Sequence, residues 1–319
     1  MPASHSPAPR SQVVLAFLCV YIFWGVTYTA AKIGVQMVPA PLLAGTRLAF
    51  GGCIMLAFCA LRGHPLVSSR REMTRLILLG VLLLFGGNVG LVWAEFYLPS
   101  GFAALLVAVV PIYVAIIEWI LPHGERLRRR GQLGLVLGFI GLGILVWPSA
   151  RSGLHGDTRQ IVAIGVLLLG ALSWTSGSVL ARRSHLTLNP LVCAGWEMIV
   201  ASLCDLTLGT TLHDWSHAHW NFRADTAIAY MVLFGSLTGF SAYTWLLANV
   251  PVAKVATYAY VNPMVAVLIG ALFLGERLQS NEYFGMGITL FAVFLVTSSK
   301  MRGGHPAAEI ECVPVEAEA

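Results

Sequence analysis

The strongest constraint on this chain is a stretch that occurs twice, about half a chain length apart. It runs YLPSGFAALLVAVVPIYVAIIEWILPHGERL at residues 97–127 and returns as NVPVAKVATYAYVNPMVAVLIGALFLGERL at 249–278. In both copies two prolines lie 12 residues apart, Pro99/Pro111 and Pro251/Pro263, and an apolar segment leads into Gly-Glu-Arg-Leu. The prolines repeat at an offset of 152 residues, far longer than the repeat of a solenoid. We therefore expect two structurally related halves.

The composition indicates that these halves lie in a membrane. Hydrophobic residues make up 57% of the 319 residues and charged residues 11%, whereas soluble domains carry about 25% charged residues. Mean hydropathy is +0.76. Because a helix needs ~20 mostly apolar residues to cross a bilayer, we predict an all-α, polytopic membrane protein with ten transmembrane helices. The predicted spans are 12–33, 42–61, 76–96, 101–121, 132–148, 161–181, 190–211, 226–247, 254–274 and 282–299.

The Lys and Arg residues predict the orientation. With the N-terminus inside, 14 of the 20 fall on the cytoplasmic side and 5 on the outer side, as expected for cytoplasmic loops enriched in these residues. Both termini are therefore expected to be cytoplasmic. Five helices per half is an odd number, so the second repeat is inverted relative to the first. The expected divisions are a tail at 1–11, a first repeat at 12–148, a periplasmic linker at 149–160, a second repeat at 161–299 and a tail at 300–319.

Polar side chains inside the spans are candidates for substrate contact, because such groups are costly in lipid and normally face a cavity. Arg47 follows Ala-Gly-Thr, and Glu197 follows Ala-Gly-Trp at the corresponding place in the second half. These opposite charges could hold the two ends of a zwitterionic substrate. The alternatives are a salt bridge between helices and snorkelling to the membrane surface. The remaining polar residues in spans or near their ends are Lys32, Asn88, Glu95, Glu118, Asp205, Lys254 and Asn262.

Aromatic side chains form a second candidate set. Trp24 and Tyr28 share a face of the first helix, and Trp174 repeats Trp24 in the sixth. Such side chains suit an aromatic or amphipathic substrate, with packing or an interfacial belt as the alternative. The complete set of predicted cavity residues is Trp24, Tyr28, Arg47, Asn88, Trp174, Glu197, Tyr243, Tyr258 and Asn262.

Two prolines are candidate hinges. Pro111 and Pro263 lie at matching places inside predicted spans, where each removes a backbone donor and should kink its helix. Matching bends in the two halves predict a gate, and the alternative is a static kink that only shapes the bundle.

Several chemistries have no signature here. All nine His residues lie outside the predicted spans and no Cys-x-x-Cys pair occurs, so no metal site is predicted. The sequence has neither a P-loop nor a Gly-x-Ser-x-Gly motif, so we expect no ATP hydrolysis, no cofactor and no catalytic residue. The basic residues form short clusters between spans, which argues against nucleic acid. The expected partners are a small-molecule substrate and membrane lipid, and a monomer is the expected state.

The repeated proline and Gly-Glu-Arg-Leu stretch, Phe23-Trp24-Gly25, and Tyr260-Val-Asn-Pro263 resemble the drug/metabolite transporter (DMT) superfamily in its ten-helix EamA-type branch, near the YddG/YedA-like amino-acid and metabolite exporters. The resemblance covers about residues 12–299. It implies two inverted five-helix repeats around a central cavity, both termini cytoplasmic, and export of metabolites across a bacterial inner membrane. It also implies a cavity-lining role for Trp24, Trp174, Tyr258 and Asn262.

These observations predict a secondary transporter that exports small organic metabolites, foremost amino acids with aromatic ones included, by alternating access. Transport would run downhill or with an ion gradient. One alternative is export of amphipathic or cationic drugs, with Glu118, Glu197 or Asp205 recognising positive charge. Others are an intramembrane enzyme acting on lipid, for which nucleophile motifs are missing, and an ion channel, for which two inverted halves supply no ring of charges.

Overall fold

The computed structural model describes residues 9–122, 129–154, 158–184, 186–277 and 280–301, and these ranges contain helices and no strands. The first Gly-Glu-Arg-Leu motif, part of the predicted linker and most of both tails lie outside the described residues. The elements are α1 (Arg10–Val35), α2 (Ala40–Leu61), α3 (Arg70–Gly80), η1 (Val81–Val89), α4 (Gly90–Tyr97), α5 (Ser100–Val107), α6 (Val110–Ile120), α7 (Arg129–Leu154), α8 (Arg159–Arg183), α9 (Pro190–Thr211), η2 (Asp214–His217), α10 (Phe222–Tyr230), η3 (Met231–Phe240), α11 (Ser241–Asn249), α12 (Val252–Val255), α13 (Tyr258–Leu274) and α14 (Ser280–Met301).

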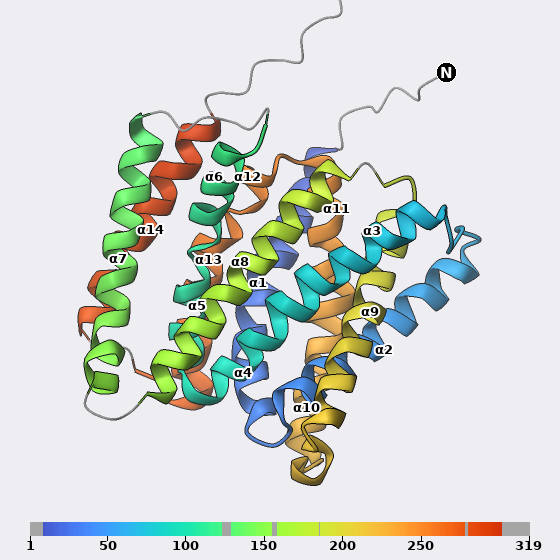
Figure 1. The fold of residues 1–319 in the computed structure, drawn as a ribbon, viewed down its shortest axis with the longest axis horizontal. Coiled ribbons are helices and arrows are strands. Elements are labelled where there is room, and N and C mark those ends of the chain that lie inside the picture. Colours follow the sequence, from blue (N-terminus) through green and yellow to red (C-terminus); the bar gives the residue numbers. More distant parts are fainter. Residues whose placement is uncertain (1–8, 123–128, 155–157, 185, 278–279, 302–319) are drawn as a thin grey trace, which may run out of the picture.

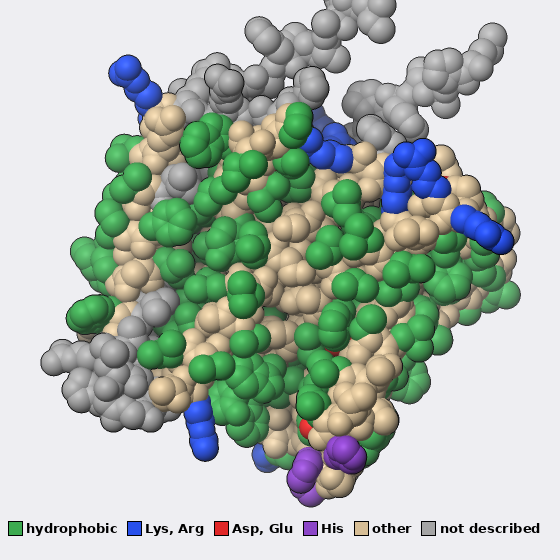
Figure 2. All heavy atoms as spheres, in the orientation of Figure 1, with side chains coloured by type: hydrophobic (Ala, Val, Ile, Leu, Met, Phe, Trp, Pro, Cys, Tyr) green, Lys and Arg blue, Asp and Glu red, His purple; other side chains and the backbone are tan. Residues whose placement is uncertain are grey.

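These elements form ten helical segments, each overlapping one predicted span, so the predicted all-helical membrane fold is confirmed. Four segments are composite: α3–η1–α4, α5–α6, α10–η3–α11 and α12–α13. Within the described residues, 7 helices are long and apolar enough by themselves to cross a membrane. Apolar side chains are spread over the whole flank seen in Figure 2, whereas Lys and Arg lie at its margins. This distribution is the one that a lipid-facing surface requires.

Proline and short polar side chains determine where several helices begin. The Asn189 side chain accepts a hydrogen bond from Leu191 N at 2.9 Å and Pro190 occupies the first turn, so α9 begins at the predicted residue. The Asn221 side chain caps α10 in the same way through the N–H groups of Arg223 and Ala224, both at 3.0 Å. These caps satisfy backbone donors that no helical bond can reach.

Helix packing follows the two-fold relation of an inverted repeat. The second and seventh segments, α2 and α9, pack on each other, as do the fifth and tenth, α7 and α14. Figure 1 shows α7 and α14 together at one edge of the bundle, with α1 and α8 near its middle. Small residues permit this approach: a Cβ at Gly141 of α7 would lie 2.8 Å from the backbone N of Thr289 in α14. Corresponding helices of the halves therefore meet at the interface between them.

Two π-helical segments occupy matching places in the halves, η1 in the third helical segment and η3 in the eighth. They begin 150 residues apart, at Val81 and Met231. The sequence did not predict them. A π-helix has more residues per turn than an α-helix, but both segments are almost entirely apolar, so the hydropathy pattern does not register the difference. Such segments are rare and often occur at functional sites.

The two candidate hinges differ in local structure. Pro111 lies in the first turn of α6, because the helix ends at Val107 and restarts at Val110. A continuous helix would have left the Val107 carbonyl without a donor at Pro111, so the chain breaks before the proline instead of bending at it. Pro263 lies inside α13, and the break in that segment comes earlier, between Val255 and Tyr258. The hinge role of both prolines stays a prediction.

Candidate functional site

A cavity lies among the central helices. It is lined by residues of α1, α2, η1, α4, α8, η3 and α13, with Val107 and Val110 at the break between α5 and α6. About 90 Å³ of it is open to the centre of a water-sized sphere. Because one water needs ~10–15 Å³ by this measure, the space holds roughly six to nine waters. A small metabolite with the volume of several waters therefore fits this part of the cavity.

We call the end of the bundle with Arg10 and Met301 the terminal side, and the end with Val35 and Ser100 the opposite side. In Figure 1 the terminal side is at the top. The cavity includes Ala31, near the end of α1, and Glu95, near the end of α4. It therefore extends from the middle of the bundle towards the opposite side.

Aromatic rings form the wall of the cavity nearest the terminal side. The ring of Trp24 lies 5.5 Å from that of Trp174 and 5.5 Å from that of Tyr258, both edge to face. Trp24 Nε1 donates to the carbonyl of Gly235 in η3 at 3.0 Å. This bond uses a helical carbonyl that the π-helical segment presents, so η3 fixes the orientation of the indole. Edge-to-face pairs of this kind add to the stability gained from burial alone.

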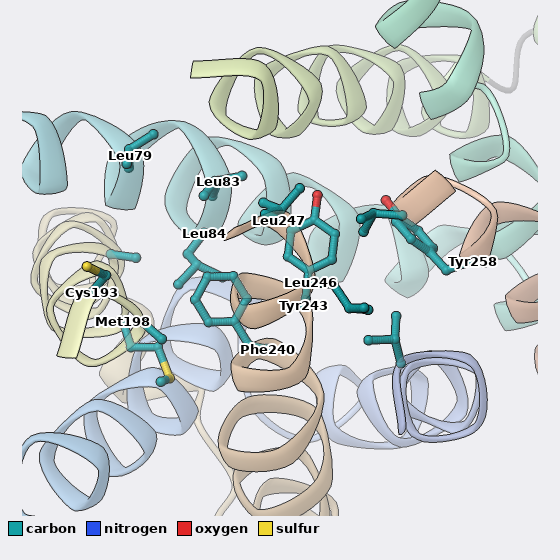
Figure 3. Close-up of a cluster of buried hydrophobic side chains, with 14 of the residues drawn as sticks. Leu79, Leu83, Leu84, Cys193, Met198, Phe240, Tyr243, Leu246, Leu247 and Tyr258 are labelled. Carbon is teal, nitrogen blue, oxygen red and sulfur yellow. The ribbon is translucent and has the colours of Figure 1, made fainter. Parts of the chain in front are cut away.

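Tyr243 supports this wall from behind. Its hydroxyl accepts a hydrogen bond from Trp174 Nε1 at 3.2 Å and bonds to Ser178 Oγ at 2.7 Å, and its ring lies 5.0 Å from that of Trp24. Figure 3 shows the buried cluster in which it packs, with Leu83, Leu84, Phe240, Leu246 and Leu247. The cavity is therefore closed on the terminal side by a packed apolar core.

The other part of the cavity is polar. Arg47 of α2 is 7% exposed and donates through Nη2 to Asn88 Oδ1 of η1 at 3.2 Å and through Nη1 to Met231 Sδ of η3 at 3.7 Å. Its Nε finds no acceptor within the described ranges. Arg47 lines the cavity and keeps one buried donor without an acceptor, and a guanidinium with a free donor is a group to which a carboxylate could bind.

Glu95 of α4 also lines the cavity, and its side chain is 0% exposed. Neither carboxylate oxygen receives a hydrogen bond from any described residue. The nearby Lys32 amine is engaged elsewhere: it donates to the backbone carbonyls of Glu95, Phe96 and Leu98 at 2.6, 3.3 and 3.0 Å. An ammonium has three donors, and these contacts, at the carboxyl end of α4, use them.

The structure brings six of the nine predicted cavity residues to the lining: Trp24, Tyr28, Arg47, Asn88, Trp174 and Tyr258. Tyr243 lies behind the wall. Asn262 is 1% exposed and belongs to the contact between α13 and α1, where a Cβ at Gly25 would lie 3.4 Å from its carbonyl.

Glu197 is a correction. It is buried on α9 against α3, where a Cβ at Gly80 would lie 2.8 Å from its carbonyl, and it does not line the cavity. The acidic groups within electrostatic range of Arg47 are Asp205 and Glu95. Arg47 and Glu197 occupy corresponding places in the sequence, but at Glu197 the backbone of α9 packs on α3. Nor do the other acids of the drug-export alternative reach the lining, since Glu118 pairs with Arg183 at 2.9 Å and Asp205 lies between α9 and α2.

Glu95 is the functional candidate that we missed. It was among the polar residues in spans or near their ends but not in the predicted cavity set. Its position just before Leu98-Pro99 could have indicated the role. The chain turns at these two residues, so α4 continues to Tyr97 and Glu95 lies buried within the bundle.

Comparisons with known proteins agree with this architecture. The EamA-like transporter family matches residues 11–147 and again 161–298. The uncharacterized inner membrane transporter YedA of Escherichia coli is 35% identical, over 89% of this chain and 90% of the relative. A probable amino-acid metabolite efflux pump of the same species is 25% identical, over 90% and 94%. A solved structure at 19% identity superposes with a TM-score of 0.68, covering 92% of this chain and 99% of the other, which supports the fold. The chain therefore belongs to the EamA-like transporter family, within the drug/metabolite transporter superfamily, and is a multi-pass membrane transporter.

Proposed function

We propose that this chain exports small zwitterionic amino acids from the cytoplasm across a bacterial inner membrane by alternating access of its two repeats. The observation that carries the proposal is a single cavity with an unsatisfied guanidinium, an unpartnered carboxylate and an aromatic wall. Arg47 would bind the substrate carboxylate, Glu95 the ammonium, and Trp24 and Trp174 the side chain. The descriptions of two relatives, an uncharacterized inner membrane transporter and a probable amino-acid metabolite efflux pump, support this proposal.

The position of the cavity along the bundle is compatible with the releasing state of an exporter. With both termini in the cytoplasm, as the Lys and Arg distribution predicts, the opposite side is the outer side. The cavity then extends outward from the bilayer midplane, while the aromatic wall and the core beneath it separate the cavity from the cytoplasm. This is the arrangement from which an exporter releases its substrate.

A second candidate is export of small amphipathic cations. The observation that favours it is the position of Asp205. This buried acid lies outside the cavity lining but close enough to Arg47 for their charges to interact. If Asp205 neutralises Arg47, then Glu95 gives the cavity a net negative charge, and a cation without a carboxylate suffices. The two candidates differ in whether substrate binding requires a free carboxylate.

Counterflow in proteoliposomes tests the proposal. The purified protein would be reconstituted with unlabelled amino acid inside, and uptake of labelled amino acids would be followed without an ion gradient. We expect saturable uptake that is competed by small amino acids and not by their amides. Competition by amides alone would select the cation candidate, and a flat result for both panels with folded protein would reject both.

A matched pair of tryptophan variants links uptake to the cavity. Trp174→Leu removes a ring from the aromatic wall, and we expect the KM for counterflow to rise at least fivefold, because a buried aromatic contact contributes about 1 kcal/mol or more. Trp119→Leu is the control, since Trp119 is 60% exposed on the outer surface of α6. Equal effects of the two changes would place the substrate elsewhere.

A further inference from the structure

Three of the buried acids in the described residues have unpartnered oxygens, and one of the three lines the cavity. Glu95, Glu197 and Asp205 are 0%, 2% and 0% exposed, and each has at least one carboxylate oxygen without a hydrogen-bond partner in the described part of the chain. Asp205 has Arg47 within electrostatic range, and neither Asp205 nor Glu197 lines the cavity. Of these three acids, Glu95 is therefore the one that lines the cavity.

No cationic side chain of the described residues donates a hydrogen bond to the Glu95 carboxylate. The titratable groups that act on it are Tyr28 and Lys32 of α1, Arg47 of α2 and Glu276 after α13. Lys32 is bound to three carbonyls, and Arg47 is shared with Asp205. The neighbouring faces of α5 and α8 are apolar, with Phe102, Ile164 and Leu167 in one buried cluster.

A carboxyl group in such a place is stable in two forms. A charged carboxylate buried without a partner is costly, so the group either binds a cation in the cavity or keeps its proton. Both occupants use the same oxygens, so they exclude each other.

We propose that Glu95 is the coupling site of this transporter, where one proton and the cationic group of the substrate bind alternately. This proposal rests on the proposed function, and it names a proton gradient as the energy source for export. When the substrate enters, the carboxyl O–H bond breaks and the proton leaves to water, and the carboxylate accepts N–H hydrogen bonds from the substrate ammonium. When the substrate leaves, a proton from the opposite side re-forms the O–H bond. The empty carrier therefore returns protonated, and a proton gradient drives export.

Proton release on substrate binding tests this directly. Wild-type protein in detergent and weak buffer, with a pH-indicator dye, would receive an amino acid that gives counterflow. We expect about one proton released for each substrate bound. Counterflow without proton release would overturn the coupling role of Glu95 and leave the proposed function intact, whereas a wild-type protein without counterflow would overturn both.

The Glu95→Gln variant locates the proton. We expect counterflow to persist at saturating substrate with a KM raised at least tenfold, because a charge-assisted hydrogen bond is lost. Proton release should disappear, and an imposed pH gradient should no longer accelerate transport. Glu118→Gln is the control, since Glu118 pairs with Arg183 away from the cavity, and it should retain both. Proton release that persists in Glu95→Gln would overturn the assignment, and Glu95→Asp should restore the release that Glu95→Gln loses.

Discussion

Arg47 links the cavity of the transporter to the interface between its halves. It lies on α2 of the first half, bonds to Asn88 at 3.2 Å, and is close enough to Asp205 on α9 of the second half for their charges to interact. Truncating it therefore has two separable consequences: the substrate loses a partner, and Asp205 becomes an uncompensated buried charge.

The Arg47→Gln variant should show both consequences. We expect the KM for amino-acid counterflow to rise at least tenfold, since hydrogen bonds to charged groups contribute ~1.5–3 kcal/mol. We also expect a lower thermal unfolding midpoint in detergent. In the double variant Arg47→Gln/Asp205→Asn the unfolding midpoint should recover while transport does not. Recovery of transport together with stability would show that Arg47 has only a structural role.

Glu276 shows what the second Gly-Glu-Arg-Leu motif does. Its carboxylate accepts hydrogen bonds from Ser100 N at 2.9 Å, Ser100 Oγ at 2.7 Å and Gly101 N at 3.3 Å. These groups form the amino end of α5 in the other half, where a negative charge is favourable. The motif therefore joins the two halves on the opposite side, which its repetition alone did not reveal.

The Glu276→Gln variant should consequently unfold more easily. We expect a loss of about 1–2 kcal/mol, because two backbone donors and a hydroxyl lose a charged acceptor. The comparison is Glu118→Gln, which breaks one partly exposed ion pair with Arg183 at 2.9 Å, a contact worth ~0–1 kcal/mol. Thermal or denaturant unfolding of the two variants in the same detergent measures the difference, and equal shifts would contradict the assignment.

At the scale of the helical segments, the paired π-helical stretches bring backbone groups to the site. η1 supplies Gly87 and Asn88 to the cavity, and η3 supplies Gly235 and Ser236. Gly87 packs on the indole of the aromatic wall: a Cβ there would lie 2.9 Å from Trp174 Cβ. The π-helical segments thus allow close approach of a helix to the ring that faces the substrate.

This packing predicts a selective effect of Gly87→Ala. The added methyl group must displace Trp174, so we expect at least a fivefold lower counterflow rate at subsaturating substrate, although alanine favours helix by about 1 kcal/mol. The control is Gly165→Ala on the same helix as Trp174, since no heavy atom lies within 4 Å of a Cβ at Gly165. It should leave transport unchanged and stability equal or higher. Similar losses in both variants would contradict a specific contact with Trp174.

At the scale of the whole molecule, the ten helices and their duplication were predictable, because lipid imposes the length and apolarity of each span. The cavity was predictable only in part. Trp24 and Trp174 were predicted because they correspond in the two halves, and Tyr258 because of its place in the ninth span and the family resemblance, and the structure places all three at the lining. Glu197 was misplaced and Glu95 missed, because hydropathy locates a residue along a helix but does not say which neighbour its face will meet. The π-helical segments left no trace in the apolar pattern at all.

If the two inverted repeats expose Glu95 to each side of the membrane in turn, the proposed exchange at Glu95 predicts how much charge crosses the membrane in each cycle. If one proton enters for each zwitterion that leaves, every cycle carries one positive charge inward, because the other charged groups of the cavity remain in place. Transport of an amino acid at equal pH should therefore respond to membrane potential. A cationic substrate exchanged for the same proton should move without net charge.

Proteoliposomes with an imposed potassium diffusion potential measure this difference. With valinomycin and no pH gradient, the potential would be made negative on the side where the substrate starts. This potential should accelerate amino-acid export by the wild-type protein, because it draws the returning proton towards that side. Glu95→Gln should transport at a rate independent of potential, since the zwitterion then crosses alone. Potential-independent export of amino acids by the wild-type protein would contradict exchange of one proton for one zwitterion. A response to potential that the wild-type protein shows and Glu95→Gln lacks would tie the net charge movement to Glu95.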